Sequence, residues 1–95
     1  MDFSTALAWL RAGKKLSRSG WNGKNLFVYL VDGSQFTVNR PPLNSIYPEG
    51  TVINYAPHID IATPEGSCSV WAPSMGDVLA YDWEIVELEE KTVNA

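Results

Sequence analysis

The most restrictive feature of this sequence is a series of short runs rich in β-branched and aromatic residues, bounded mostly by Gly, Pro, Asn or Asp. Such runs are typical of β-strands, and the residues between them favour turns. We expect strands at 26–31 (LFVYLV), 35–38, 51–55, 59–62, 68–72 and 83–88 (WEIVEL). Most of the connections are short, so the pattern predicts mainly antiparallel pairing.

A short helix is predicted before the first strand. Ser4 is placed to cap it, and the helix runs through Leu7 and Leu10 to a stop at Gly13. Phe3, Leu7 and Leu10 then share one face. Because a helix of this length is unstable alone in water, we expect that face to dock on the sheet.

A second short helix is predicted before the last strand. Ser74, with Asp77 three residues later, forms a capping-box pattern ahead of residues 78–80. The fold class is therefore α+β: a single small domain spanning 1–95, mostly antiparallel β-sheet, with an N-terminal α-helix and a short second helix before the last strand.

The middle of the chain predicts a hairpin followed by an irregular segment. The Asp32-Gly33-Ser34 turn is expected to pair strand 26–31 with strand 35–38. Residues 39–50 (NRPPLNSIYPEG) contain three prolines and a glycine, which predicts a long proline-rich loop or arm. Its apolar Leu43, Ile46 and Tyr47 lead us to expect that it folds back on the sheet or enters a neighbouring subunit.

The last predicted strand, 83–88, carries apolar residues on both faces, so it is best covered on both sides, with another protomer as a candidate for one of them. Trp83 shares a face with Ile85, and for Trp83 a place in the core is favoured over one facing a ligand.

The charge distribution argues against polymeric nucleic acid as a ligand. Seven Lys and Arg against eleven Asp and Glu give a net charge of −4, whereas binding to phosphates needs a basic face. Five of the seven basic residues lie in the first quarter, and the C-terminal stretch from Asp77 to Glu90 is acidic. Two solvated faces are the favoured interpretation, and attraction between the two ends is the alternative.

The sequence shows neither a signal peptide nor an apolar run long enough to span a bilayer, which predicts a soluble protein with no membrane partner. The single cysteine, Cys68, is best suited to a reducing cytoplasm.

Candidates for catalysis are few. Strand alternation places His58, the single histidine, beside Asp60, and a structural role is favoured because nothing completes a triad. Cys68 is interpreted as a small core residue. Asp60, Asp77 and Asp82 lack the spacing of metal ligands. We therefore expect a protein that is not an enzyme, with no cofactor and no metal.

The turn Gly20-Trp21-Asn22-Gly23-Lys24 supports two interpretations. In one, Trp21 fills the core and Asn22-Gly23 makes a turn. In the other, the indole is presented to a flat ligand while Arg18 and Lys24 hold an anion. A ligand that is both flat and anionic has the properties of a nucleotide.

Several motifs resemble the Thoeris anti-defence family of the second type. They are Phe3, Leu7, Gly13 and Arg18 in that order, GWNGK at 20–24, NRPPL at 39–43, PHID at 57–60 and WAPSMGDVLAYDW at 71–83. The most specific parts are the WNG turn and the closing Ser-x-x-Asp-x-Leu-Ala-x-Asp-Trp signature. The resemblance covers nearly the whole chain.

The resemblance implies a non-catalytic sponge encoded by a phage or prophage. Such proteins assemble as homotetramers and sequester a cyclic ADP-ribose isomer, 1″–3′ glyco-cyclic ADP-ribose, made by TIR-domain enzymes, which blocks Thoeris immunity. Some also hold cyclic dinucleotides in a second site. The implied location is the cytoplasm of the infected bacterial host cell.

The resemblance also directs attention to particular ligand-binding residues. We expect Phe3 and Trp21 to stack on the adenine, with Trp71 as a second wall. Hydrogen bonds to the ribose or the base edge are expected from Asn22, Ser74, Asp77 and Asp82, with helix capping as the rival role of Asp77. Arg18 and Lys24 are expected to face the diphosphate.

Two alternatives remain open. One is a small protein-interaction module with no nucleotide ligand, which uses the apolar loop. The other is a weak phosphodiesterase or nucleosidase that uses His58, Asp77 and Asp82.

Overall fold

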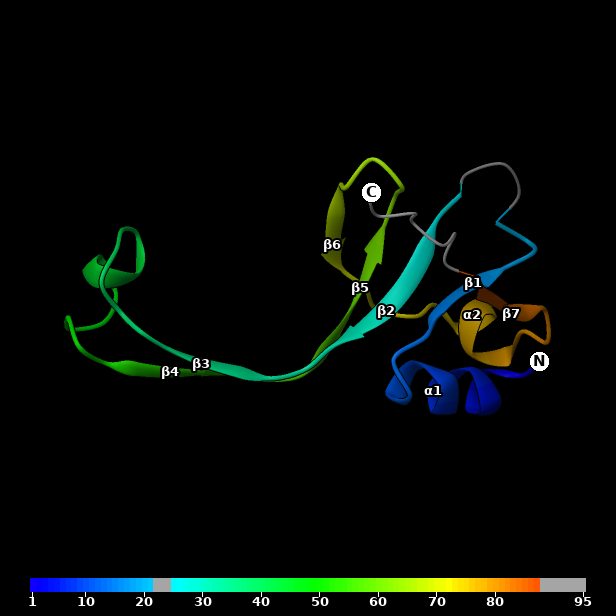
Figure 1. Ribbon diagram of the computed structural model, residues 1–95, viewed down its shortest axis with the longest axis horizontal. Helices are drawn as coiled ribbons and strands as arrows, with labels where there is room; N and C mark the ends of the chain where they lie inside the picture. Colours follow the sequence, from blue (N-terminus) through cyan, green and yellow to red (C-terminus); the bar gives the residue numbers. More distant parts are fainter. Residues whose placement is uncertain (22–24, 88–95) are drawn as a thin grey trace, which may run out of the picture.

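The computed structural model describes residues 1–21 and 25–87, and it has the predicted α+β fold (Figure 1). Its elements in chain order are α1 (Phe3–Arg11), β1 (Lys15–Arg18), β2 (Phe27–Val31), β3 (Ser34–Thr37), the 3₁₀ helix η1 (Leu43–Ser45), β4 (Val52–Tyr55), β5 (His58–Ala62), β6 (Cys68–Val70), α2 (Met75–Leu79) and β7 (Trp83–Val86). An N-terminal helix, antiparallel strands and a short helix before the last strand are all confirmed.

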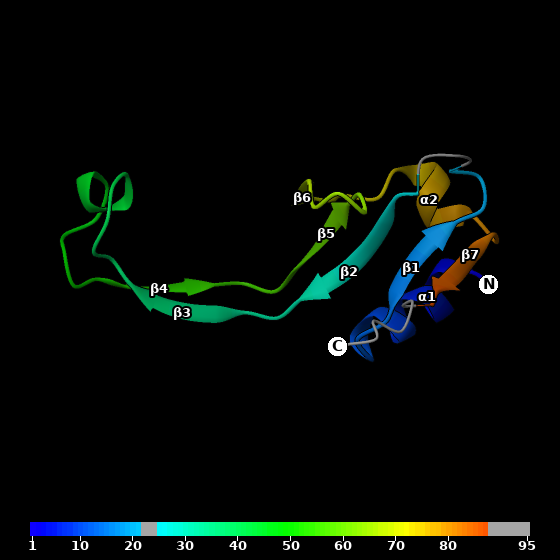
Figure 2. The same cartoon turned by 45° about the horizontal axis from the view of Figure 1, so that its top comes forward.

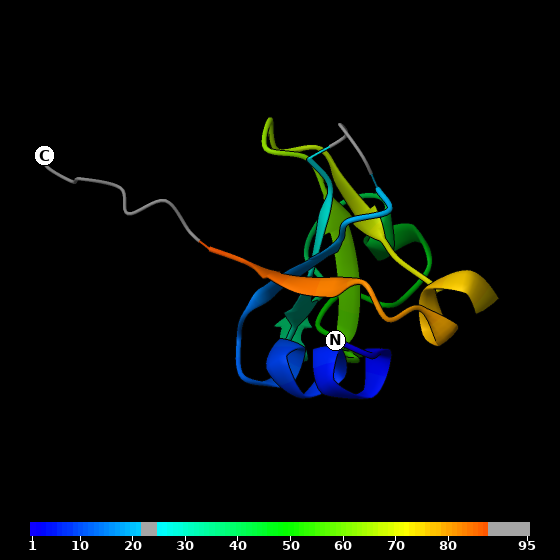
Figure 3. The same cartoon turned by 90° about the vertical axis from the view of Figure 1, so that its right-hand side faces the viewer.

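Five strands form the main sheet in the order β6-β5-β2-β1-β7, and all neighbours are antiparallel. α1 lies on one side of β1 and β7 (Figures 2 and 3). Its buried face meets the sheet in a core whose fully buried members are Ala6, Leu10, Leu16, Val28 and Trp83. The expected docking of the short helix on the sheet is thus confirmed.

α1 begins earlier than the predicted Ser4 cap. Asp2 is the N-cap, and its carboxylate accepts a 2.9 Å hydrogen bond from the Thr5 backbone N–H. The prediction of Ser4 as the cap is therefore wrong: Ser4 lies in the first turn, and Asp2 adds a charge that favours the helix N-terminus. The predicted stop is confirmed, because Gly13 follows the helix with a φ of +93° that suits glycine.

The predicted hairpin between β2 and β3 is wrong. β2 pairs with β5, and β3 pairs with β4, so the chain passes Gly33 without reversing. A Cβ at Gly33 would lie 2.8 Å from the Tyr55 carbonyl oxygen and 3.3 Å from Pro57 Cδ. Glycine is needed here for close approach of the two strands where they bend, rather than for a turn.

The two strands leave the main sheet as an arm, which we define as residues 32–57. The arm projects far from the sheet (Figure 1), and the radius of gyration is 16.6 Å against about 13 Å for a compact chain of this length. The proline-rich segment forms the tip of this arm. It does not fold back on the sheet, so that alternative is wrong, and entry into a neighbouring subunit stays a prediction.

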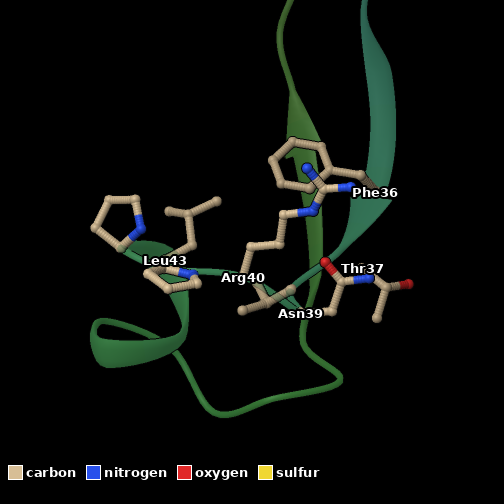
Figure 4. Close-up of a pocket in the computed structure, with 8 residues that line it drawn as sticks. Phe36, Thr37, Asn39, Arg40 and Leu43 are labelled. Carbon is tan, nitrogen blue, oxygen red and sulfur yellow. The ribbon is translucent and has the colours of Figure 1, made fainter.

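The tip is held by its own contacts. Val38 is buried there, and its backbone exchanges hydrogen bonds with Gly50 and Thr51 at 3.0 and 2.9 Å. A cavity of about 500 Å³ opens beside it, and Figure 4 shows Arg40 reaching toward Phe36 across this cavity. Apolar side chains, the polar side chains of Thr37 and Asn39, and the cation of Arg40 therefore line this cavity at the far end of the arm.

Two other predictions concern the sheet edges. The expected place of Cys68 in the core is wrong: Cys68 is exposed, because β6 is an edge strand with little packed on it. The predicted strand 83–88 is β7, at the opposite edge, and Leu88 lies outside the described residues. A turn at Pro64-Glu65-Gly66 joins β5 to β6, with a φ of +101° at Gly66.

Candidate functional site

Four aromatic side chains from separate parts of the sequence pack together, and we call them the aromatic cluster: Phe3, Trp21, Trp71 and Trp83. Trp83 is its centre and is only 2% exposed. The indole Nε1 of Trp83 donates a 2.9 Å hydrogen bond to the backbone carbonyl of Asp77 in α2. The prediction that Trp83 belongs to the core is confirmed.

Phe3, Trp21 and Trp71 surround Trp83 and are each half-buried. Their ring centroids lie 5.5, 5.4 and 5.9 Å from that of Trp83. One side of Trp21 therefore packs against the core, while part of its surface faces solvent. The interpretation of Trp21 as a core residue is therefore confirmed in part, and contact of its exposed surface with a ligand stays a prediction.

Trp21 and Trp71 form a corner rather than a slot. Their centroids are 6.4 Å apart and their planes meet at 76°. A flat ring that stacks on one indole would meet the other at its edge, which is a favourable arrangement for aromatic groups. Trp21 and Trp71 therefore cannot stack on opposite faces of the same base.

An ion-pair network lies next to these rings, and we call it the Arg18 cluster: Arg18, Asp77 and Asp82. Arg18 Nη1 lies 2.8 Å from Asp77 Oδ1, and Arg18 Nε lies 2.7 Å from Asp82 Oδ1. A third, longer contact of 3.5 Å joins Nη2 to Asp82 Oδ2. Attraction between the basic N-terminal part and the acidic C-terminal part, the less favoured interpretation of the charge pattern, therefore occurs here.

Asp82 also fixes the turn that carries Trp21. Its Oδ2 accepts hydrogen bonds from the Gly20 backbone N–H at 2.8 Å and from the Ser19 hydroxyl at 3.4 Å. A Cβ at Gly20 would come within 2.9 Å of the same oxygen, so this glycine permits the approach. No local sequence pattern predicts this role, because it depends on the pairing of Arg18 with Trp83, which places Asp82 beside the turn.

Ser74 and Asp77 form the predicted capping box of α2. The Ser74 hydroxyl accepts from the Asp77 N–H at 3.1 Å, and Asp77 Oδ2 accepts from the Ser74 N–H at 2.9 Å. Asp77 thus caps the helix with one oxygen and binds Arg18 with the other. Its carboxylate is 11% exposed, so it serves mainly within the protein.

These contacts shift the pKa values of both carboxylates downward. Burial alone would raise the pKa of Asp77, but hydrogen bonds from Ser74 and Arg18 outweigh it and lower that pKa. The hydrogen bond from Arg18 is the largest cause of the lowered pKa of Asp82. Hydrogen bonds to Asp82 and then Asp77 raise the pKa of Arg18, which stays charged.

The lowered pKa values predict acid sensitivity. Asp77 and Asp82 bind protons less readily in the folded protein than in the unfolded chain. The stability that these two carboxylates contribute is therefore fully present above the ordinary carboxyl pKa of about 3.9. It is lost as the pH falls through their lower pKa values in the folded protein. Asp82→Asn should be less stable than the unmodified protein at pH 7, and the difference in unfolding free energy, measured by urea unfolding, should be smaller at pH 3. An equal difference at both pH values would contradict this prediction.

The remaining candidates are dispersed. Asn22 and Lys24 lie outside the described residues. His58 pairs with Asp60 through Nε2 and Oδ1 at 3.3 Å, as predicted from strand alternation. The enzymatic alternative needs His58 with Asp77 and Asp82, but His58 contacts Asp60, whereas Asp77 and Asp82 both bind Arg18.

The described residues, 1–21 and 25–87, contain no group of three or more His, Cys, Asp or Glu placed to hold a metal ion. Over the same residues, none of the helices combines the length and the apolar character that crossing a bilayer requires.

Comparison with known proteins gives two matches that span most of the chain. The family model described as Thoeris anti-defense 2-like domain (Tad2-like) matches residues 1–86. A protein of Bacillus phage SP01 called Thoeris anti-defense 2 is 34% identical to this chain over 96 residues, which covers 90% of this chain and 94% of the phage protein. The aromatic cluster and the Arg18 cluster both lie within the matched region.

Proposed function

This chain belongs to the Thoeris anti-defense 2-like family, and from this we propose that it binds and sequesters the cyclic ADP-ribose isomer 1″–3′ glyco-cyclic ADP-ribose without cleaving it. Membership supports a phage anti-Thoeris role. In the proposed mechanism, the bound signal no longer reaches the Thoeris effector, in the cytoplasm of the infected host. The observation that carries the proposal is the half-exposed corner of Trp21 and Trp71 beside the Arg18 cluster.

The corner suits an adenine base. The base stacks on the exposed surface of Trp21 and meets Trp71 at its edge, with Phe3 completing the aromatic wall. Trp83 supports all three rings from below and takes no part in contact with the ligand. Since stacking accepts any flat ring, the neighbouring polar groups must provide the specificity.

Polar groups beside the corner suit the rest of the ligand. Arg18 uses three of its five N–H donors in hydrogen bonds to carboxylates, which leaves two N–H donors for the diphosphate. We assign Lys24 to the diphosphate as well. Of the two carboxylates that bind Arg18, that of Asp82 is the more exposed, and we assign it to accept a hydrogen bond from a ribose hydroxyl. We also assign Asn22 and Ser74 to ligand hydrogen bonds, and Asp77 chiefly to holding Arg18 in place.

The proposal includes assembly as a homotetramer. α2 and the following turn present large apolar side chains to solvent: Met75, Leu79 and Tyr81 are 72%, 66% and 82% exposed. Met75 lies within the capping box that positions Asp77, and Leu79 and Tyr81 follow it, so a second copy seated there lies next to the proposed ligand site. A deeper site shared between protomers suits a protein of this size, and a second site for cyclic dinucleotides belongs to the same proposal.

Recovery of the signal distinguishes a sponge from an enzyme. The protein is incubated with the product of an activated TIR-domain enzyme, unbound material is removed, and the protein is denatured by heat. We expect the intact cyclic isomer to be released in amounts that match the number of sites. A linear or hydrolysed product would instead establish the phosphodiesterase alternative.

Trp21→Ala should weaken binding of the cyclic ADP-ribose isomer about 5- to 150-fold, because loss of a stacked indole costs about 1–3 kcal/mol per base. Isothermal titration calorimetry measures this directly. Trp9→Ala is the matched control, since Trp9 is a half-exposed indole of α1 outside the aromatic cluster, and its affinity should stay near that of the unmodified protein. Equal affinity in both variants would remove Trp21 from the site.

A protein-interaction module is the second candidate function, and the arm is the observation that favours it. Phe36, Ile46 and Val52 are exposed along the arm, far from the aromatic cluster. A pure interaction module predicts no heat in the same calorimetric titration with the nucleotide.

A further inference from the structure

The outer face of the main sheet is apolar along its central strand, β2. In β2, Val28 points to the core, so its neighbours Phe27, Tyr29 and Val31 share the opposite face. An antiparallel sheet with one wet face normally carries polar residues there. All three side chains are half-buried, although no helix of residues 1–21 and 25–87 packs on this side, since α1 covers the face of Leu16 and Val28.

Two opposite charges on this outer face, Lys15 and Asp60, lie in one row across the strands, whereas Glu84 of β7 lies in the next row, opposite Ser17. Leu16 is opposite Val28, which places Lys15 opposite Tyr29, and Tyr29 is itself paired with Asp60. The row is therefore a cation on β1, an aromatic ring on β2 and a carboxylate on β5. The Nζ of Lys15 lies 4.2 Å from the centroid of the Phe27 ring, which confirms that it is on this face.

Such a row is complementary to itself under one kind of twofold symmetry. Consider two copies whose main sheets stack on each other and are related by a twofold axis that lies between the sheets and runs parallel to β2. This axis places β1 of one copy over β5 of the other, so each Lys15 faces Asp60 of the other copy. An axis perpendicular to the strands places Lys15 over Lys15 and is disfavoured by like charge. The strands of two packed sheets cross at about 30°. This crossing moves each Lys15 away from the facing Asp60 by less than the length of a lysine side chain, so the two groups still reach each other.

We propose that a second copy of this chain covers the outer face, with Tyr29 near the symmetry axis and two reciprocal Lys15–Asp60 pairs on either side of it. The aromatic and apolar residues of β2 form the centre of the interface, and the charges fix its orientation. This interface rests on the proposed self-association but needs no nucleotide.

Reciprocal charge reversal tests the arrangement. Lys15→Glu places two carboxylates in each pair, and Asp60→Lys places two ammonium groups there, so each variant alone should raise the dissociation constant of the dimer at least about tenfold. In a mixed dimer of the two variants, the introduced carboxylate faces the introduced ammonium group, and the unchanged Asp60 faces the unchanged Lys15. Association should therefore return in the mixture. Native mass spectrometry and sedimentation equilibrium without nucleotide measure both effects.

Lys14→Glu and Glu65→Lys are matched controls that reverse single charges at exposed positions outside the row, and they should leave association unchanged. Circular dichroism checks that each variant is folded. Variants that associate as the unmodified protein does, or variants that dissociate and are not rescued by mixing, overturn the proposed interface. A protein that is monomeric at every concentration overturns the proposed homotetramer as well, so the two failures are distinguishable.

Discussion

Trp83→Ala should destabilise the protein by about 3–5 kcal/mol, the range measured when large aromatic residues are removed from cores. The side chain is 2% exposed and contacts the three other members of the aromatic cluster, so its removal leaves a cavity beneath all of them. It also removes the donor bonded to the Asp77 carbonyl at 2.9 Å. Because a domain of this size has a total stability of about 5–14 kcal/mol, this loss is a large fraction of it.

Urea unfolding followed by circular dichroism measures the change in the free energy of unfolding. Trp83→Phe separates the two causes, since it keeps most of the ring and loses the Nε1 donor, and it should be intermediate. Trp9→Ala removes an indole from the exposed side of α1 and should cost less than Trp83→Ala. A Trp83→Ala protein within about 1 kcal/mol of the unmodified one would show that the cluster does not depend on its centre.

Local sequence patterns predict most of the elements, but they predict no strand at β1 (Lys15–Arg18). The capping box needs only Ser74 and Asp77, three residues apart, and it is present as predicted. The N-terminal cap was wrong because Asp2 and Ser4 are both good caps, and the choice depends on how Phe3 packs against Trp83. Local preference alone does not include that contact.

Pairing between distant residues was beyond the sequence patterns. Asp32-Gly33 is a strong turn signal, yet Gly33 serves a bend whose partner residues are Tyr55 and Pro57, more than twenty positions away. The prediction of Cys68 as a core residue depends on its place in a strand beside Val70, but the strand order leaves it at an edge. Strand order was not predictable from the runs themselves.

The candidate site shows the same division. Trp21 was singled out from its own turn, whereas the contacts that hold this turn come from Asp82, about sixty residues later. The charge pattern did contain the signal, since basic residues cluster early and acidic residues late. What it lacked was the antiparallel pairing of β1 with β7, which brings Arg18 next to Asp82.

Arg18→Met should destabilise the protein at pH 7, although by less than Trp83→Ala, because the ion pairs that Arg18 makes with Asp77 and Asp82 are only partly buried. The methionine keeps much of the side-chain volume, so the loss reports mainly on charge. It leaves the carboxylates of Asp77 and Asp82 close together without their shared cation. Since Asp82 also holds the turn of Trp21, affinity for the cyclic ADP-ribose isomer should fall in the same variant.

Two comparisons decide whether the shared cation is the cause. At pH 3 the carboxylates take up protons and the repulsion disappears, so the difference in unfolding free energy between Arg18→Met and the unmodified protein should shrink. Adding Asp77→Asn to Arg18→Met removes one of the two charges, so the double variant should lose less stability than the two single losses added together. Arg11→Met, at the exposed end of α1, should change stability little at either pH. Strict additivity of the two substitutions would mean that Arg18 acts through packing alone, and that Asp77 and Asp82 are held apart by the backbone rather than by the guanidinium.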